Sequence, residues 1–373
     1  MDAAKFSEEV ERRGCSIRCG ADSDATTIHI SGLGEWLDDM IALASDALLH
    51  PVFDETELDK LRTNLIADMM VELVDVEWLA ARACASRAYV DHPYRHPKNG
   101  TPESLRMLRR DDLMRAHQRM CASERFVIVA GPVDAEAVTS KLSDALSNMP
   151  APLPLPLPPR VHVSGGFGVL AAKDDAVQTA FRILLPGVNH QHADYAAMHL
   201  VANVLGGYTL ARLFTILREE KGYTYGAYAF PSVRPLSASI SIVTSVGNEF
   251  TADTLDTIAQ ELDRISHEII NVDEFENARQ TILGSFARNC ETPQQTASLI
   301  YTMLQYGLPM DYFERHIDKI QTLEAIDVQS AQQAYFQTTN WIVGCSGVGT
   351  IIESAVRPHV QKIEYWSPSG YSQ

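Results

Sequence analysis

Residues 205–228 read LGGYTLARLFTILREEKGYTYGAY, and the patterns on either side of this stretch alternate between helix and strand. Before it we expect a strand at Gln178–Leu185 and a helix at Ala193–Leu205. After it, Ser237–Val243 alternates as a half-buried strand does, and Ala252–Ile270 has the period of an amphipathic helix. The mixture predicts an α+β layered domain, with an antiparallel-rich sheet and helices on one face.

The first half of the chain repeats this plan. Ala25–Ser31 alternates in the same way as Ser237–Val243, and an amphipathic helix at Glu35–His50 follows it. A second helix is expected from Asp54, and another from Asp273 in the second half, where early carboxylates suit the helix dipole.

A constant offset supports a duplication. Adding 215 to six residue numbers in the first half reaches similar residues in the second; they are Leu105, Leu108, Asp112, Leu113, Ala116 and Phe126, with Ile320, Leu323, Asp327, Val328, Ala331 and Trp341. Both stretches predict a turn, a helix and then an apolar strand, at Phe126–Ala130 and at Trp341–Cys345. The period is too long for a solenoid, so we infer two homologous domains.

A proline-rich segment, Pro150–Pro159, separates the two copies. Alternate prolines remove backbone donors and fix φ, which favours a stiff linker over a ligand for an SH3-like partner. The expected organisation is an N-terminal domain at residues 1–149, a linker at 150–160 and a C-terminal domain at 161–373. The first copy reaches its alternating strand by Ala25, whereas the second needs roughly 75 residues after the linker. We therefore expect the first domain to lack its opening strands.

Composition excludes several classes of partner. The chain has 373 residues and a formal net charge of −17, which opposes nucleic-acid phosphates and anionic membranes. Six scattered cysteines indicate reduced thiols rather than a disulfide framework or a zinc finger. No apolar run reaches the roughly 18–20 residues that span a bilayer. The sequence thus predicts a soluble protein and favours the cytoplasm without fixing the compartment.

The stretch at residues 205–228 resembles the signature of the second homologous domain in pitrilysin/insulinase peptidases, a family that includes the mitochondrial processing peptidases. The matching positions are Gly206, Gly207, Arg212, Leu213, Phe214, Leu217, Arg218, Gly222 and Tyr225. Agreement around Asp91–Tyr94, Ser104 and Asp112 extends the resemblance over nearly the whole chain.

The resemblance implies that Arg218 and Tyr225 bind substrate, because the matching pair in the family contacts the peptide near the scissile bond. A guanidinium offers a planar fork of donors to a carbonyl or carboxylate. A phenol can donate to an oxygen on which charge develops during hydrolysis. The alternative is that Arg218 pairs with Glu219 or Glu220 and that Tyr225 packs in the sheet.

The zinc site of the family has no match in this sequence. Hydrolysis there needs a His-x-x-Glu-His helix and a distal Glu, and none of the twelve histidines stands in that motif or its reverse. Asp68 occupies the position of the distal Glu and is one methylene shorter, while Leu61 replaces a supporting Glu. No metal is expected at the nearest histidine pairs, which are His190 with His192 and His92 with His96.

Together these features predict a non-catalytic, substrate-binding subunit of a heterodimeric zinc metallopeptidase that acts on peptides. The chain would hold no cofactor and no catalytic residue of its own. A zinc-bearing family member, as hetero-oligomer partner, would supply the zinc, while Arg218 and Tyr225 would hold the peptide. Two alternatives stay open, namely a structural or peptide-binding relative without a proteolytic role, and a partial or decayed peptidase.

Overall fold

The computed structural model describes residues 3–154 and 156–368, and its contacts divide the chain into two compact units. Unit 1 comprises Met1–Ile66, Lys98–Leu157 and Thr292–Ser298. Unit 2 comprises Ala67–Pro97, Pro158–Glu291 and Leu299–Gln373. Residues 67–97, which precede the proline-rich segment, therefore pack with the C-terminal part of the chain.

Unit 1 is mainly helical and holds a two-stranded sheet. β1 (Ser16–Ala21) pairs antiparallel with β2 (Thr26–Ser31) along their whole length. Its helices are α1 (Ala3–Glu11), α2 (Leu37–Leu49), the first part of α3 (Glu55–Glu72), α5 (Pro102–Met107), α6 (Arg110–Cys121) and α7 (Ala135–Ala145). The Asp54 carboxylate accepts the N–H of Thr56 at 2.9 Å, so α3 begins where an acidic cap was expected.

Unit 2 is built around one seven-stranded sheet. Its spatial order is β3 (Val161–His162), β7 (Ser237–Gly247), β5 (Gln178–Pro186), β8 (Ile342–Gly347), β4 (Phe167–Ala172) and β9 (Lys362–Tyr365), and β6 (Ala227–Arg234) also pairs with β7. β5 runs antiparallel to both of its neighbours, β7 and β8. β4 runs parallel to β8 and β9. Most aligned residue pairs are antiparallel, as expected.

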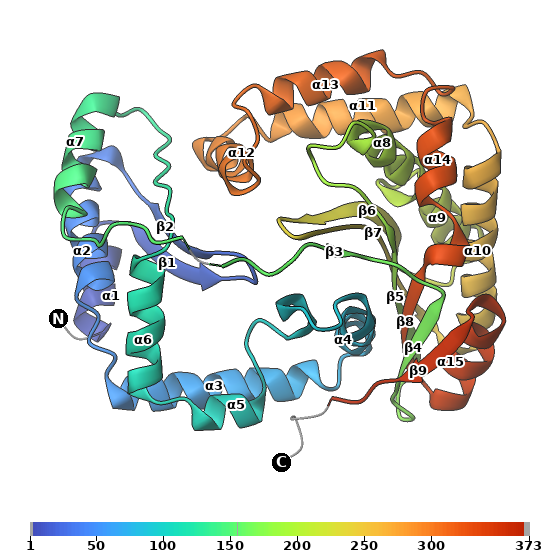
Figure 1. The fold of residues 1–373 in the computed structure, drawn as a ribbon, viewed down its shortest axis with the longest axis horizontal. Coiled ribbons are helices and arrows are strands. Elements are labelled where there is room, and N and C mark those ends of the chain that lie inside the picture. Colours follow the sequence, from blue (N-terminus) through green and yellow to red (C-terminus); the bar gives the residue numbers. More distant parts are fainter. Residues whose placement is uncertain (1–2, 155, 369–373) are drawn as a thin grey trace. The chain divides into compact units, whose positions relative to one another are not determined.

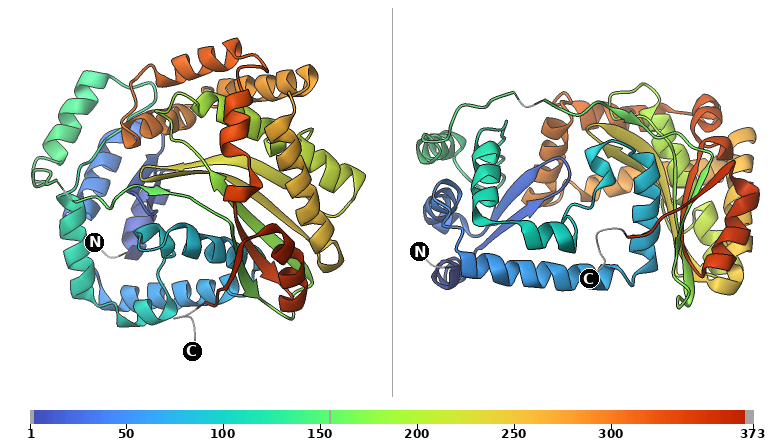
Figure 2. Two further views of the ribbon diagram at one scale, coloured as in Figure 1. Left: turned by 45° about the vertical axis from the view of Figure 1, so that its right-hand side comes forward. Right: turned by 60° about the horizontal axis from the view of Figure 1, so that its bottom comes forward.

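Helices cover both faces of this sheet (Figure 1 and Figure 2). On one face, Phe181 and Ile183 of β5 join a large core with α8 (Tyr195–Gly206) and α10 (Thr251–His267). On the other, Leu184 packs with Cys84 of α4 (Val76–Ala88). The expectation of helices on one face alone is wrong, because α4 covers part of the second face.

A glycine explains how α4 approaches so closely. A Cβ built on Gly344 of β8 would lie 2.5 Å from the carbonyl oxygen of Ala80 and 2.5 Å from the Cβ of Cys84. Only a residue without a side chain permits this contact. Unit 2 also contains α11 (Val272–Arg288), the second half of α12 (Pro293–Gln305), α13 (Tyr312–Thr322), α14 (Gln329–Tyr335) and α15 (Gly349–Val356).

Most helices and strands expected from the sequence are confirmed, but the prediction of one strand is wrong. The alternating segments became β2 and β7, and Trp341–Cys345 lies largely within β8. Phe126–Ala130 forms no strand, and Val127 and Val129 are 56% and 43% exposed. A strand is defined by its neighbour, and this segment has none in the described part of unit 1.

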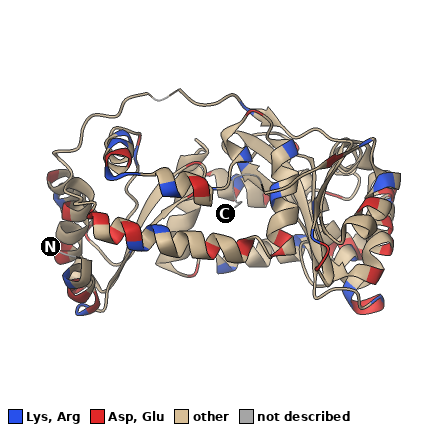
Figure 3. Cartoon of the chain, turned by 90° about the horizontal axis from the view of Figure 1, so that it is seen from below, with Lys and Arg blue, Asp and Glu red and all other residues tan. Residues whose placement is uncertain are grey.

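Three further features concern the proline-rich segment, the distribution of charge and the possibility of a membrane span. Residues 150–154 and 156–160 carry neither helix nor strand, and residue 155 of the expected linker lies outside the described residues. Acidic and basic positions are interspersed along the helices (Figure 3). Among the described residues, no helix is both long enough and apolar enough to cross a membrane.

Candidate functional site

The stretch that carries Arg218 lies in unit 2, between α8 and β6. α8 ends at Gly206, where a Cβ would lie 2.4 Å from the backbone nitrogen of Ala229 in β6, so glycine is required for this close approach. A short turn of α-helix, α9 (Arg212–Phe214), leads into a π-helix, η3 (Thr215–Glu220). Single π-turns are rare and occur frequently at functional sites.

Buried side chains hold this stretch against the core. Leu213, Phe214 and Leu217 are buried almost completely. Arg212 donates from Nε and Nη2 to the two carboxylate oxygens of Glu274, at 3.0 and 2.8 Å, and its Nη1 lies 3.7 Å from Oε2 of the buried Glu261. A bidentate pair fixes both distance and orientation, so the beginning of the π-helix is firmly placed.

Arg218 lies in the π-helix, beyond that anchor in the sequence. Its guanidinium carbon lies 4.8 Å from the ring centre of Phe214, a cation–π contact, and its Nε lies 3.5 Å from Oε1 of Glu219. The side chain is 46% exposed. Arg218 therefore does pair with a neighbouring glutamate, while much of its surface remains accessible to a ligand.

Tyr225 stands in the turn that leads into β6 and is 91% exposed. Gly222 has a φ of +68°, which ends the π-helix with a left-handed residue that glycine adopts without strain. The hydroxyl of Thr224 donates to the carbonyl of Gly226 at 2.9 Å and accepts its N–H at 3.1 Å. The turn is ordered, but the Tyr225 ring does not pack in the sheet.

The neighbour of Tyr225 on the same turn is held differently. The Tyr223 ring stacks on Phe250 with centroids 4.0 Å apart, and the carboxylate of Asp253 raises the pKa of the Tyr223 phenol by accepting its hydrogen bond. Lys221 donates to the same carboxylate at 2.6 Å. These contacts hold Tyr223 and Lys221 against the rest of unit 2, whereas the phenol of Tyr225 is exposed to solvent.

The zinc-ligand positions of the peptidase signature do not form a metal site. Asp68 and Leu61 both lie on α3 and are both exposed to solvent. Leu61 offers no donor atom. Among residues 3–154 and 156–368, no group of three or more His, Cys, Asp or Glu is arranged to hold a metal ion. The donor set present here does not fit catalytic zinc.

The structure also contains a cluster of histidine and tyrosine side chains that no sequence motif indicated. His190 precedes α8, while His199 and His316 lie on α8 and α13. The rings of Tyr195 and Tyr312 lie between them, and the Tyr312 hydroxyl is 3.2 Å from Nδ1 of His190. Burial lowers the pKa of His190 and of His199 to about 4, and that of His316 to about 3. Three histidines scattered over 127 positions form no motif, so only folding brings them together.

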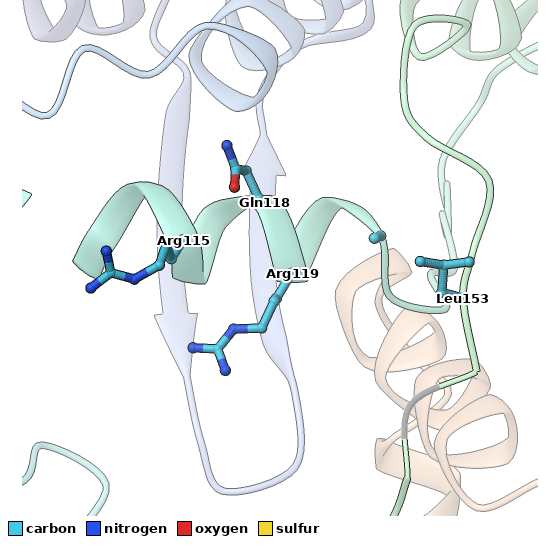
Figure 4. Close-up of a pocket in the computed structure, with 5 residues that line it drawn as sticks. Arg115, Gln118, Arg119 and Leu153 are labelled. Atoms are coloured by element: carbon cyan, nitrogen blue, oxygen red, sulfur yellow. The ribbon is translucent and has the colours of Figure 1, made fainter. Parts of the chain in front are cut away.

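Two surface cavities lie in unit 1. The first, of about 460 Å³, is lined by Arg115, Gln118 and Arg119 of α6 and by Leu153 beyond its C-terminal end (Figure 4). The second, of about 610 Å³, lies between α7 and Val127 and Val129. Neither is lined by Arg218 or Tyr225.

Comparison with known proteins places this geometry in a family. Residues 108–282 match the peptidase M16 inactive domain. This part of the chain belongs to the M16 peptidase family. M16 is the family of the pitrilysin and insulinase type, so the resemblance drawn from residues 205–228 is confirmed.

The relatives have low sequence identity to this chain, but they match it over most of its length. A non-peptidase homolog YmxG from Helicobacter pylori is 21% identical over 344 residues, covering 90% of this chain and 78% of the relative. An uncharacterized zinc protease YmxG from Bacillus subtilis is 24% identical over 300 residues, covering 79% and 72%.

Solved structures agree on the M16 fold. The crystal structure of a peptidase M16 inactive domain from Pseudomonas fluorescens has a TM-score of 0.80 at 20% identity, covering 93% of this chain and 84% of that one. A chain of Complex III2 from Candida albicans has a TM-score of 0.72 at 17% identity, covering 91% and 83%. At such low identity these likenesses establish the architecture alone.

Proposed function

We propose that this chain is the non-catalytic, substrate-binding partner of a zinc-bearing M16 peptidase. The observation that carries the proposal is the exposure of Tyr225 and Arg218 on a well-anchored π-helix and turn, in a chain whose zinc-ligand positions hold Asp68 and Leu61. A structural tyrosine would pack or donate within the protein, as Tyr223 does.

The proposed roles follow from the two functional groups. The Arg218 guanidinium would exchange its weak contact with Glu219 for a carbonyl or carboxylate of the bound peptide, which accepts two parallel hydrogen bonds. The Tyr225 phenol would donate to the carbonyl oxygen as it gains charge. The attacking water and the zinc would belong to the partner.

We further propose that the chain arose by duplication of one domain, with copies at 1–149 and 161–373 joined by the linker at 150–160. The recurrence of similar residues at an offset of 215 supports this. So does the equivalence of β1–β2 in unit 1 to β6–β7 in unit 2, each an antiparallel pair followed by an amphipathic helix.

A second candidate function is a structural or peptide-binding role without proteolysis. It is supported by the name of the Helicobacter pylori relative, a non-peptidase homolog, and by the fold shared with a chain of Complex III2. The two candidates differ in one measurable respect, because only the first requires Arg218 and Tyr225 to change the turnover of a peptidase.

The test is to mix the purified chain with each zinc-bearing M16 peptidase encoded in the same genome and to follow cleavage of a quenched fluorescent peptide library. We expect one mixture to cleave faster than the peptidase alone, and Arg218→Ala to remove the gain. Arg315→Ala changes another exposed arginine that pairs with a local carboxylate, and serves as the matched control. If no mixture gains activity and no complex forms, the proposed function is wrong.

A further inference from the structure

The second face of the sheet in unit 2 is only partly covered. α4 packs there mainly against β8, β5 and β4. β6 and β7 lie outside this main contact, and β6 exposes two aromatic side chains, Tyr228 at 42% and Phe230 at 40%. Ala227 and Ala229 point the other way, into the large core, as alternation along a strand requires. Neighbouring exposed rings of this kind mark a surface that another molecule covers.

Arg182 of β5 lies on the same face, close to these rings. Arg182 is directly opposite Val243 of β7, which is directly opposite Tyr228 of β6, and directly opposite residues share a face. The Arg182 side chain also reaches over β7, because its Nη1 donates to the hydroxyl of Ser241 at 3.1 Å. Ser241 is in turn opposite Phe230. The positive charge therefore lies near β7, one strand spacing (about 5 Å) from Phe230.

No acidic side chain neutralises Arg182. In the described part of the chain its guanidinium bonds only the neutral Ser241 and forms no ion pair. Burial lowers the pKa of the Arg182 guanidinium, since desolvation disfavours the charged form. Glu77 of α4 acts on it through space, but the Glu77 carboxylate accepts its hydrogen bond from the Ser245 hydroxyl, at 2.6 Å. A guanidinium carries five N–H donors, so Arg182 retains donors for an anion.

A second arginine without a carboxylate partner lies at the far end of β6. Arg234 shares the face of Phe230, because the two occupy alternate positions of one strand, about 13 Å apart. Its guanidinium carbon lies 4.8 Å from the ring centre of Tyr94 and 5.7 Å from that of Tyr89, and it forms no ion pair with any described residue. Cation–π contacts hold the side chain without neutralising its charge. The two exposed rings thus lie between two cations, in a chain whose net charge is −17.

The aromatic pair is continuous with the candidate site. The ring centre of Phe214 lies 4.8 Å from the guanidinium carbon of Arg218 and 5.9 Å from the ring centre of Tyr228. A Cβ on Gly226 would lie 2.7 Å from the hydroxyl oxygen of Tyr228, so this ring lies against the turn that carries Tyr225. These contacts link Tyr228 to both residues of the candidate site.

We propose that the uncovered face of β6 and β7 selects the substrate, and that it takes an extended peptide with an aromatic side chain flanked by acidic ones. The aromatic side chain packs on Tyr228 and Phe230. A carboxylate two residues away accepts hydrogen bonds from Arg182, since alternate side chains of an extended peptide point the same way and lie about 6.6 Å apart. The inference rests on the proposed function for the claim that this peptide continues to Arg218 and Tyr225.

A nucleic acid fits this face less well than a peptide does. Single-stranded nucleic acids also stack on aromatic rings and pair with arginine. Their phosphates, however, add one negative charge for every nucleotide, which the net charge of −17 opposes. An acidic peptide brings only a few charges and can place them at the two guanidiniums. A peptide is therefore the occupant that the charge distribution favours.

The test measures binding of labelled peptides to the full chain alone, by fluorescence anisotropy. The probe is the peptide GEAFAEG, while GQAFAQG lacks its carboxylates and GEAAAEG lacks its ring. We expect GEAFAEG to bind, and each of the other two to bind roughly tenfold more weakly, because a charge-assisted hydrogen bond and a packed ring each contribute to affinity. Equal affinity for all three peptides, or no binding of GEAFAEG at millimolar concentration, contradicts the proposal.

Chain variants identify the contacts. Arg182→Gln is expected to weaken GEAFAEG roughly tenfold and to leave GQAFAQG unchanged, so that the loss depends on the carboxylates of the peptide. Phe230→Ala removes an exposed ring and should weaken both peptides. Arg288→Gln changes another arginine of unit 2 that donates to a serine, and should weaken neither. An equal loss for both peptides in Arg182→Gln would mean that the substitution only disturbs the face, and would overturn the assignment of the carboxylate to Arg182.

The outcome is distinguishable from that of the peptidase test. Peptide binding by the chain alone requires no zinc-bearing protein and no turnover, so it can succeed when every mixing assay fails. Conversely, an active mixture that cleaves the library without preference for acidic, aromatic peptides would support the proposed function and refute selection by this face. Displacement of GEAFAEG by a single-stranded oligonucleotide at lower concentration would identify a nucleic-acid surface and overturn the proposal.

Discussion

The Nδ1 atom of His199 lies 3.2 Å from the Nε2 atom of His316, and the two ring centres are 5.5 Å apart with an interplanar angle of 14°. The centre-to-centre distance exceeds the N···N distance by about two ring radii, so the line between the nitrogens passes close to both ring centres. This is an edge-to-edge N–H···N hydrogen bond between α8 and α13 rather than face-to-face stacking. One of the two nitrogens donates its proton to the lone pair of the other, so this hydrogen bond occupies both nitrogens.

This pair predicts acid sensitivity. The groups that face it are His190, Tyr195, Tyr312 and, more distantly, Lys319. None of them is an anion that would favour an imidazolium, and burial lowers the pKa of His199 to about 4 from the ordinary 6.5. The unfolded chain therefore binds protons first as pH falls. Stability from this cluster is complete above about pH 6.5 and is lost towards pH 4.

The measurement is the urea unfolding midpoint between pH 7 and pH 4. We expect His199→Gln with His316→Gln to flatten the fall of the midpoint in this window. His267→Gln changes an exposed histidine in the same unit and should leave the slope unaltered. Equal slopes for the double variant and the parent chain would show that other groups govern acid unfolding.

Substitution by alanine is expected to have opposite effects on stability at two glycines of unit 2. Gly206→Ala places a Cβ 2.4 Å from the backbone nitrogen of Ala229, and overpacking of this kind costs about 1–3 kcal/mol. Gly284→Ala, within α11, meets only the Nη1 atom of Arg288 at 3.8 Å. Alanine there should stabilise by about 0.5–1 kcal/mol, because it restricts the unfolded chain and favours helix.

Thermal unfolding of the two alanine variants checks this pair of predictions. The thermal midpoint should fall for Gly206→Ala and rise for Gly284→Ala. A rise for Gly206→Ala would mean that α8 and β6 are not as close as described.

The Arg212 ion pair predicts a large loss of stability on truncation. Arg212→Ala would leave the buried Glu261 with Arg264 as its remaining partner and Glu274 without its bidentate donor. Removing one partner of a buried pair costs about 3 kcal/mol or more. Arg315→Ala breaks an exposed pair with Asp311 and should change the unfolding free energy by less than about 1 kcal/mol. Chemical denaturation of both variants compares the two values directly.

Tyr225→Phe tests the proposed phenol in an active mixture. It removes one oxygen from a side chain that is 91% exposed, so folding should not change. If the phenol stabilises developing charge, kcat of the complex should fall roughly a hundredfold while KM stays nearly constant. Tyr365→Phe, at another exposed tyrosine, is the control. A change confined to KM would assign Tyr225 to ground-state binding instead.

The sequence predicted local elements well because period and capping are local signals. The strand at Thr26–Ser31 and the helix after Asp54 formed where alternation and an acidic cap indicated. Phe126–Ala130 failed because strand formation needs a neighbour, which no local pattern reports. The packing of Cys84 against Gly344 also joins residues 260 positions apart, so the second helical layer could not be read from the sequence.

The candidate site could likewise be predicted from the sequence only in part. Arg218 and Tyr225 were found because they belong to a recognisable signature, but their exposure came from the structure. The bidentate contact of Arg212 with Glu274 could not be predicted, since an isolated glutamate 62 positions away is one of many. The π-helix was also invisible, because its hydrogen bonds leave no periodic trace in so short a segment.

That π-helix makes the direction of Arg218 sensitive to chain length. Its turn accommodates one more residue than an α-turn would, as the bond from the N–H of Lys221 to the carbonyl of Ile216, five residues back, shows. Deleting one residue between Thr215 and Leu217 would let the segment relax to an ordinary α-helix, and would turn Arg218 by about 100° relative to Arg212. Insertions and deletions, rather than substitutions, are thus the simplest evolutionary means of re-aiming the guanidinium while its anchor stays in place.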